Sequence, residues 1–186
     1  MTKLVGISGS LRRASFNTAL LRAAATLLPA GASLEIRTLN DIPLYDGDLE
    51  AAEGLPAAVS ALKEALVAAD GVLLATPEYN NGIPGVFKNA IDWLSRPSSD
   101  MTRVFGGRMV ALMGASPGPF GTTLSQAAWL PVLRTLGTSP WFGARLMVSH
   151  ANDVFDAALD IKDAAVKERV RLFLAGFVDA VRRCKR

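Results

Sequence analysis

A short apolar run near the start of the chain passes directly into a polar loop: Leu4-Val5-Gly6-Ile7-Ser8 is followed by Gly9-Ser10-Leu11-Arg12-Arg13-Ala14-Ser15-Phe16-Asn17-Thr18. An apolar run of this length is typical of a strand buried on both faces of a parallel sheet. Ser15 is a favourable N-cap for the helix that the next residues predict. The stretch therefore indicates a strand, a loop and a helix, which is the first unit of an α/β fold.

Four further strand candidates follow, separated by segments of helical period. The five predicted strands span residues 4–8, 34–39, 71–76, 108–113 and 144–149. The second differs from the others because its apolar residues alternate with the charged Glu35 and Arg37. Alternation predicts one wetter face, as at a sheet edge. We therefore predict an α/β fold with a flavodoxin-like, doubly wound, five-stranded parallel sheet of order 2-1-3-4-5 and helices on both faces.

Length and composition predict a single domain over residues 1–186. Half of the residues are hydrophobic, yet no segment approaches the ~18 consecutive apolar residues that a membrane span needs. The first residues run into a strand without the pattern of a secretory signal, so we expect a cytoplasmic protein. The single histidine, His150, and the single cysteine, Cys184, cannot form the cluster that zinc prefers, so we nominate no metal ligand.

Two segments and the end of the chain complete the predicted organisation. Pro131 should kink or interrupt the helix predicted over residues 122–136. The polar, glycine-containing segment 97–107 is expected to be a surface loop. The net charge is +3, and four of the last five residues are positive: Arg182, Arg183, Lys185 and Arg186. No nucleic-acid-binding motif accompanies them, so we expect a solvated helix end and no nucleic-acid partner.

The loop after the first strand predicts a phosphate site. In open α/β sheets, ligands bind beyond the carboxyl ends of the strands, near the first and third. This loop offers hydroxyls, an amide, Arg12 and a helix N-terminus, and residues 6–29 contain no carboxylate. It matches neither the P-loop nor the G-x-G-x-x-G fingerprint, which favours a terminal monophosphate such as that of FMN. Taken alone, the loop could equally be a capped helix start with solvated arginines.

Two more loops lie where the same ligand would reach. Residues 76–85 contain two prolines and two glycines, which make a rigid turn with exposed main chain. Tyr79 could face an isoalloxazine ring, and the main chain of residues 78–80 could bind its polar edge. The glycine-rich loop 114–121 could lie close to the ring. Either loop alone could be a plain connection, but three such loops together indicate a shared ligand.

These residues resemble the NADPH-dependent FMN reductase family. The resemblance rests on Gly9-Ser10-Leu11-Arg12 with Ser15-Phe16-Asn17, on Thr76-Pro77-Glu78-Tyr79-Asn80, and on Pro84-Gly85 with Lys88-Asn89-Ala90-Ile91-Asp92-Trp93. It covers nearly the whole chain and is greatest to the bacterial chromate and quinone reductases.

The resemblance implies specific roles for residues in all three loops. The phosphate and ribityl chain of FMN would be held by Ser10, Arg12, Ser15, Phe16 and Asn17. The ring would be lined by Pro77, Glu78, Tyr79 and Asn80, with Ser116 and Gly118 on the other side. The family also implies a homodimer or homotetramer in which residues 84–93 help form the subunit contact.

The expected activity is NAD(P)H-dependent reduction of small acceptors, such as quinones, free flavin, azo compounds or chromate, by a ping-pong hydride mechanism. NADPH or NADH would be the hydride donor. Because a flavin carries the chemistry, we nominate no catalytic side chain. One alternative is a non-enzymatic FMN-binding electron shuttle or redox sensor, although such shuttles tend to be acidic. Another is a hydrolase with Ser15 or Ser116 as nucleophile, but neither lies in a G-x-S-x-G elbow and only His150 could be the base.

Overall fold

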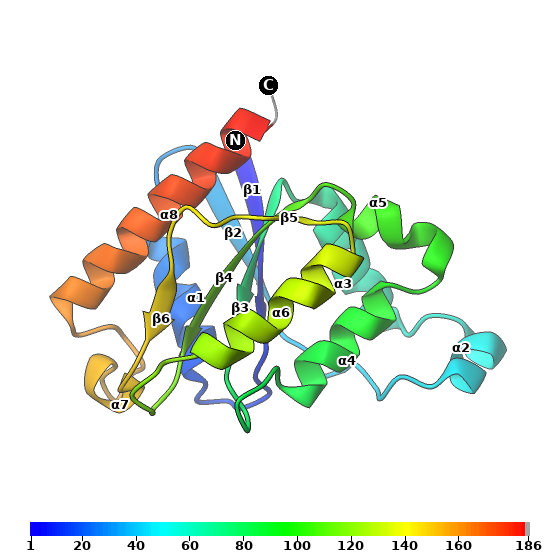
Figure 1. Ribbon diagram of the computed structural model, residues 1–186, viewed down its shortest axis with the longest axis horizontal. Helices are drawn as coiled ribbons and strands as arrows, with labels where there is room; N and C mark the ends of the chain where they lie inside the picture. Colours follow the sequence, from blue (N-terminus) through cyan, green and yellow to red (C-terminus); the bar gives the residue numbers. More distant parts are fainter. Residues whose placement is uncertain (185–186) are drawn as a thin grey trace.

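The computed structural model of the chain describes residues 1–184, and its helices surround one parallel sheet (Figure 1). The strands are β1 (Thr2–Ser8), β2 (Ala32–Arg37), β3 (Gly71–Ala75), β4 (Met109–Ala115), β5 (Ser139–Pro140) and β6 (Leu146–Val148). Every pair is parallel, and the order is β2-β1-β3-β4-β5, with β6 also beside β4. The predicted flavodoxin-like order is confirmed.

Helices cover both faces of the sheet, as predicted. On one face lie α1 (Phe16–Leu27) and α8 (Ala164–Cys184), and on the other lie α3 (Ala57–Ala68), α4 (Gly85–Leu94) and α6 (Thr123–Thr135) (Figure 1). The shorter helices are α2 (Gly47–Glu53), η1 (Ser98–Asp100), α5 (Met101–Phe105) and α7 (Ala151–Val154). Each face has its own apolar cluster, in which Phe177 on one side and Trp93 and Trp129 on the other are fully buried. No helix within residues 1–184 is both long enough and apolar enough to cross a membrane.

The second strand lies at an edge, as its alternation predicts. β2 pairs with β1 alone in the sheet path, and its residues are half-buried apart from the exposed Glu35. Glu35 forms an ion pair with Arg37 of the same strand. The charged residues of this strand are therefore tolerated because, within residues 1–184, no other strand pairs with its outer side.

The strand predicted over residues 144–149 is present as the shorter β6, but the sequence did not indicate a further short strand, β5, that precedes it. β5 pairs with the start of β4 and β6 with its end. The amides of Ser139 and Trp141 donate to Arg108 and Val110, so the pairing with β4 continues past Pro140. The chain leaves the sheet after Trp141, whose ring packs against Phe173 and Phe177 at centroid distances of 5.2 and 5.5 Å.

Pro131 does not interrupt its helix, contrary to one of the two expected outcomes. α6 runs continuously from Thr123 to Thr135 with Pro131 inside. Pro131 is exposed, and so is Ala127, whose carbonyl lies one turn earlier. That carbonyl loses its intrahelical partner on the side that faces water, so solvent can take the place of the missing N–H.

The end of α8 is less solvated than expected. Arg182 donates to the Thr2 hydroxyl at 3.1 Å and to the Ala30 carbonyl at 2.8 Å, which ties the helix to the start of β1. Arg183 forms an ion pair with Asp179. The predicted charges at Lys185 and Arg186 lie outside the described residues.

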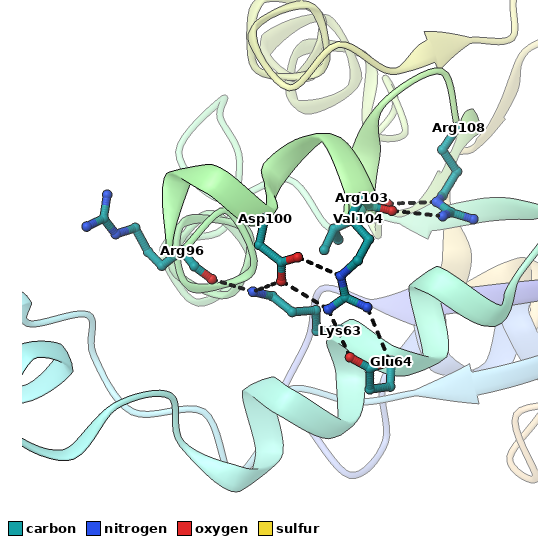
Figure 2. A network of polar contacts seen from close by, with 7 residues as sticks. All are labelled: Lys63, Glu64, Arg96, Asp100, Arg103, Val104 and Arg108. Carbon is teal, nitrogen blue, oxygen red and sulfur yellow. Dashed lines mark hydrogen bonds and ion pairs between the residues drawn. The ribbon is translucent and has the colours of Figure 1, made fainter.

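The segment 97–107 is not a surface loop, and that prediction is wrong. It forms η1 and α5, and the side chains of Val104 and Phe105 are buried in the apolar cluster. Its polar residues are instead used in a network with α3 (Figure 2). The buried Lys63 donates to Asp100 at 2.9 Å and to the Arg96 carbonyl.

Two arginines extend this network. Arg103 bridges Asp100 and Glu64, so η1, α5 and α3 are joined by charge (Figure 2). Arg108 donates to the main-chain carbonyls of Val104 and Ala69. The polar side chains of this segment therefore stabilise its contact with α3.

Replacing Asp100 with asparagine should lower the melting temperature by about 5 °C near pH 7, because the buried Lys63 loses its carboxylate partner. Hydrogen bonds from Arg103 and Lys63 hold the pKa of Asp100 well below its ordinary 3.8. A carboxyl with a depressed folded pKa stabilises the fold above its unfolded pKa and loses that effect as pH falls toward the folded pKa. The difference between wild type and Asp100→Asn, measured by circular dichroism, should therefore shrink below about pH 4. Asp41→Asn, at an exposed position, is the control; a difference that does not change with pH contradicts this account.

Candidate functional site

The loops predicted to hold a ligand leave the sheet side by side. Ser8 of β1 pairs with Ala75 of β3, and Ala75 pairs with Met113 of β4, so β1 and β3 end at one level and β4 ends two residues beyond it, at Ala115. Main-chain bonds continue the pairing, because Gly9 donates to the Ala75 carbonyl at 2.9 Å. The loops emerge at the lower edge of the sheet in Figure 1.

One pocket lies among these three loops. All of the predicted site residues line it except Asn80 and Gly118, and it also includes two neighbours of Ser116 that the sequence reasoning missed. The lining residues are Ser10, Arg12, Ser15, Phe16, Asn17, Pro77, Glu78, Tyr79, Ala115, Ser116 and Pro117. The missed residues, Ala115 and Pro117, could have been found only from their position beside Ser116, because neither carries a polar side chain.

The first loop presents positive charge. Ser15 caps α1, its Oγ accepting from the Thr18 amide at 3.2 Å, and no acidic residue lies in the first turn of the helix. Ser10 Oγ accepts from the Arg12 amide at 3.3 Å. Within residues 1–184 the exposed guanidinium of Arg12 has no hydrogen bond or ion pair with another side chain. This end of the pocket can therefore receive an anion without displacing an internal partner.

Asn17 joins the first loop to β4. Its Oδ1 accepts from the Ala115 amide at 3.0 Å and its Nδ2 donates to the Ala115 carbonyl at 2.9 Å. Both residues are buried, so this pair satisfies main-chain groups that water cannot reach. The resemblance assigns Asn17 to the ligand, but only its second amide hydrogen remains free of this pair.

The second loop ends in a tight turn. Tyr79 and Gly82 exchange main-chain hydrogen bonds of 3.2 and 3.0 Å. Asn80 and Asn81 between them have φ of 50° and 63°, a left-handed conformation that asparagine adopts more readily than most residues. Asn80 thus lies at the tip of the turn, beyond the pocket lining, while the Tyr79 side chain, 46% exposed, stands at the mouth.

The base of the second loop is bound to α6. The Oε2 of Glu78 accepts from the amides of Leu124 and Ser125, at 2.8 and 3.0 Å. The hydroxyl of the buried Thr76 lies 2.8 Å from that of Ser125 and accepts from Trp129 Nε1 at 3.1 Å. Residues on both sides of Pro77 therefore hold the same turn of α6.

The third loop is fixed by the end of β6 and the start of α7. The Ser116 amide donates to the Val148 carbonyl, and the Ser116 carbonyl accepts from the Ala151 amide, both at 3.0 Å. The Ser116 hydroxyl donates to the Gly121 carbonyl. Gly118 lies outside the lining because its carbonyl is turned to the amide of His150, at 3.1 Å.

Close approach explains one glycine at the start of this loop. A Cβ on Gly114 would lie 2.4 Å from the Thr76 carbonyl oxygen and 2.1 Å from Thr122 Oγ1. Only glycine therefore allows β4 to pass this close to the second loop.

A second pocket lies at the far edge of the sheet, and its lining contains no residue of the three loops. It has a volume of about 220 Å³ and is mainly apolar, formed by α6 and the segment from Pro140 to Met147. The polar donors converge instead in the pocket between the loops. No group of His, Cys, Asp or Glu in the described part of the chain is arranged to hold a metal ion.

Comparison with known proteins finds relatives that are all described as reductases or oxidoreductases. Residues 2–153 match the family model described as NADPH-dependent FMN reductase. An NAD(P)H-dependent FMN reductase of Pseudomonas aeruginosa is 42% identical over 183 residues, covering 98% of this chain and 97% of that protein. A 2-hydroxy-1,4-benzoquinone reductase of a Burkholderia species is 36% identical, covering 95% of this chain and 92% of that protein. The structure of the flavoenzyme FerB from Paracoccus denitrificans, an NAD(P)H:(acceptor) oxidoreductase, has a TM-score of 0.85 at 31% identity and covers 98% of both chains.

Replacing Asn17 with alanine should lower the free energy of unfolding by about 2–3 kcal/mol, because the buried amide and carbonyl of Ala115 both lose their partner. Urea denaturation followed by tryptophan fluorescence measures the change. The exposed Asn152→Ala is the control and should leave the free energy of unfolding within about 0.5 kcal/mol of the wild type. Equal effects of the two substitutions would mean that the Asn17 pair does not stabilise the fold.

Proposed function

The chain belongs to the NADPH-dependent FMN reductase family, and we propose that it binds FMN between its three loops and reduces small electron acceptors with NAD(P)H. It is an oxidoreductase of that family. The observation that carries the proposal is the pocket beyond the ends of β1, β3 and β4, with Arg12 in the loop that leads into α1 and without a side-chain partner within residues 1–184. The carboxylate that could oppose an anion there, Glu78, is bound to the amides of α6.

The donors in the pocket fit FMN. The phosphate would be held by Ser10, Arg12 and Ser15, which lie at a helix N-terminus without a nearby acidic residue in its first turn. Phe16 and the free amide hydrogen of Asn17 would contact the ribityl chain.

The ring would lie against the second and third loops. Pro77, Tyr79 and the main chain of residues 78–80 would bind one side, with Ser116 and Gly118 on the other. Bound FMN would supply the redox chemistry, accepting a hydride from NAD(P)H and passing electrons to an acceptor in a ping-pong cycle. The protein would orient the ring through main-chain groups, and Tyr79, which is exposed, would border the side through which both substrates enter.

Quinones are the acceptors we propose first. The similar proteins include one named for 2-hydroxy-1,4-benzoquinone and others named quinone reductase. Free flavin, azo compounds and chromate are further candidates, because an exposed ring face would accept many small oxidants. NADPH and NADH both remain candidate donors.

Two alternatives from other classes are less well supported. An FMN-binding shuttle or sensor would use the same pocket but would not turn over NAD(P)H. A hydrolase would need an activated serine, but Ser15 Oγ accepts from an amide and the Ser116 hydroxyl donates to Gly121. Among the described residues, no hydrogen bond joins His150 to either serine.

We also propose a cytoplasmic homodimer or homotetramer in which residues 84–93 contribute to the contact. The support is a groove of about 340 Å³ between α4 and α6, lined by Lys88, Asp92 and apolar residues such as Met101 and Val132. A mixed polar and apolar groove beside an amphipathic helix is a reasonable surface for another subunit.

Steady-state oxidation of NADPH with a benzoquinone tests the proposed activity. The rate should depend on added or retained FMN, and double-reciprocal plots at several quinone concentrations should give parallel lines, as a ping-pong cycle requires. Retained FMN without NADPH oxidation would favour the shuttle or sensor, and intersecting lines would contradict the ping-pong order.

Replacing Arg12 with alanine should weaken FMN binding about tenfold or more, because a charge-assisted bond to phosphate is lost. Binding of riboflavin, which lacks the phosphate, should change by less than about twofold, since Arg12 would not reach the ring. Quenching of flavin fluorescence measures both dissociation constants. Arg13→Ala, at the adjacent exposed arginine, is the matched control. If Arg12→Ala weakens both flavins equally, the phosphate does not bind at Arg12.

A further inference from the structure

The first turn of α6 lacks its own side-chain cap. Thr122 is the N-cap residue but makes no capping hydrogen bond, and its Oγ1 accepts instead from Gln126 Nε2 at 3.0 Å. No acidic residue lies in the first turn. The amides of Leu124 and Ser125 would therefore lack a partner from their own segment.

Glu78 satisfies these amides from a distant part of the chain. One carboxylate oxygen accepts from both, at 2.8 and 3.0 Å, across a separation of more than forty residues. A carboxylate at this position also interacts favourably with the positive end of the helix. The Oε2 of Glu78 is thus bound to the protein and is committed to α6.

The cap formed by Glu78 also connects two of the loops that form the pocket. Glu78 lies between the buried Pro77 and the turn at Tyr79, in the main chain proposed to bind the ring. α6 begins where the third loop ends, and its buried Trp129 anchors it in the core. The cap therefore joins the two loops that would lie on either side of the ring.

From this geometry we infer that Glu78 is a positioning residue, which sets the FMN ring site by capping α6 with its carboxylate. The inference rests on the proposed function. In this account the carboxylate of Glu78 binds α6, and the main chain of the second loop contacts the ring. What matters for binding is then a hydrogen-bond acceptor at the correct reach, and the negative charge is secondary.

Three substitutions at Glu78 distinguish the effect of side-chain length from the effect of the negative charge. Glu78→Gln keeps an acceptor at the same reach and should bind FMN within about threefold of the wild type. Glu78→Ala loses the acceptor, and Glu78→Asp keeps the charge but shortens the side chain, so each should weaken FMN binding about tenfold. Because the ring site is affected, riboflavin binding should weaken by the same factor as FMN binding.

Asp163→Ala is the matched control for a purely structural cap. Asp163 caps α8, with its Oδ1 2.9 Å from the Val166 amide, and lies outside the pocket between the loops. Its loss should lower the melting temperature without changing the affinity for FMN. The melting temperatures of all variants are measured alongside the dissociation constants, and binding is measured well below each of them.

Three results would overturn the inference. The first is a Glu78→Ala protein that loses thermal stability but binds FMN within twofold of the wild type. The second is a Glu78→Gln protein as weak as Glu78→Ala, which would show that the charge itself matters. The third is a wild type that binds neither flavin, which overturns the proposed function as well. If Glu78→Ala does not fold, the FMN affinities of Glu78→Asp and Glu78→Gln are compared instead, and Glu78→Asp should bind more weakly.

Discussion

The parallel pairing of β1, β3 and β4 holds Ser8, Ala75 and Met113 at one level, and every part of the site depends on this register. Parallel strands present their carboxyl ends at the same edge, so three loops far apart in sequence begin side by side. A shift of one strand by a single residue would move its loop along the sheet and turn its buried side chains to the other face. The register is protected because both faces of the sheet are covered by apolar clusters.

The polar residues of the site divide into two groups. The side chains of Asn17, Thr76 and Glu78 bind the protein itself, and each joins one loop to another element. Arg12 remains available to a ligand, as do the main-chain groups of Glu78 and Asn80, which have no hydrogen-bond partner within residues 1–184, whereas those of Tyr79 bind Gly82. Because side chains hold each loop at its base, the loops can keep one conformation although they lie at the surface. A flavin would then meet a site whose shape exists before it binds.

Much of the fold could be predicted from the sequence, because strand order and edge position follow from hydrophobic patterning, which reports local burial. The composition of the pocket could also be predicted, since its residues come from loops whose place the topology determines. What the sequence could not show was where polar side chains find their partners. Segment 97–107 looks like a loop because its partner Lys63 lies on another helix. The bond from Glu78 to α6 could not be foreseen because α6 is distant in sequence. The departure of the chain from the sheet between β5 and β6 likewise depends on the packing of Trp141 against α8.

The most direct test of the central claim is the visible absorbance spectrum of the protein after mixing with FMN, gel filtration and anaerobic addition of NADPH. The account predicts that the flavin bands elute with the protein and bleach when NADPH is added. If the protein elutes without flavin absorbance, the pocket between the three loops is not an FMN site and the account is wrong.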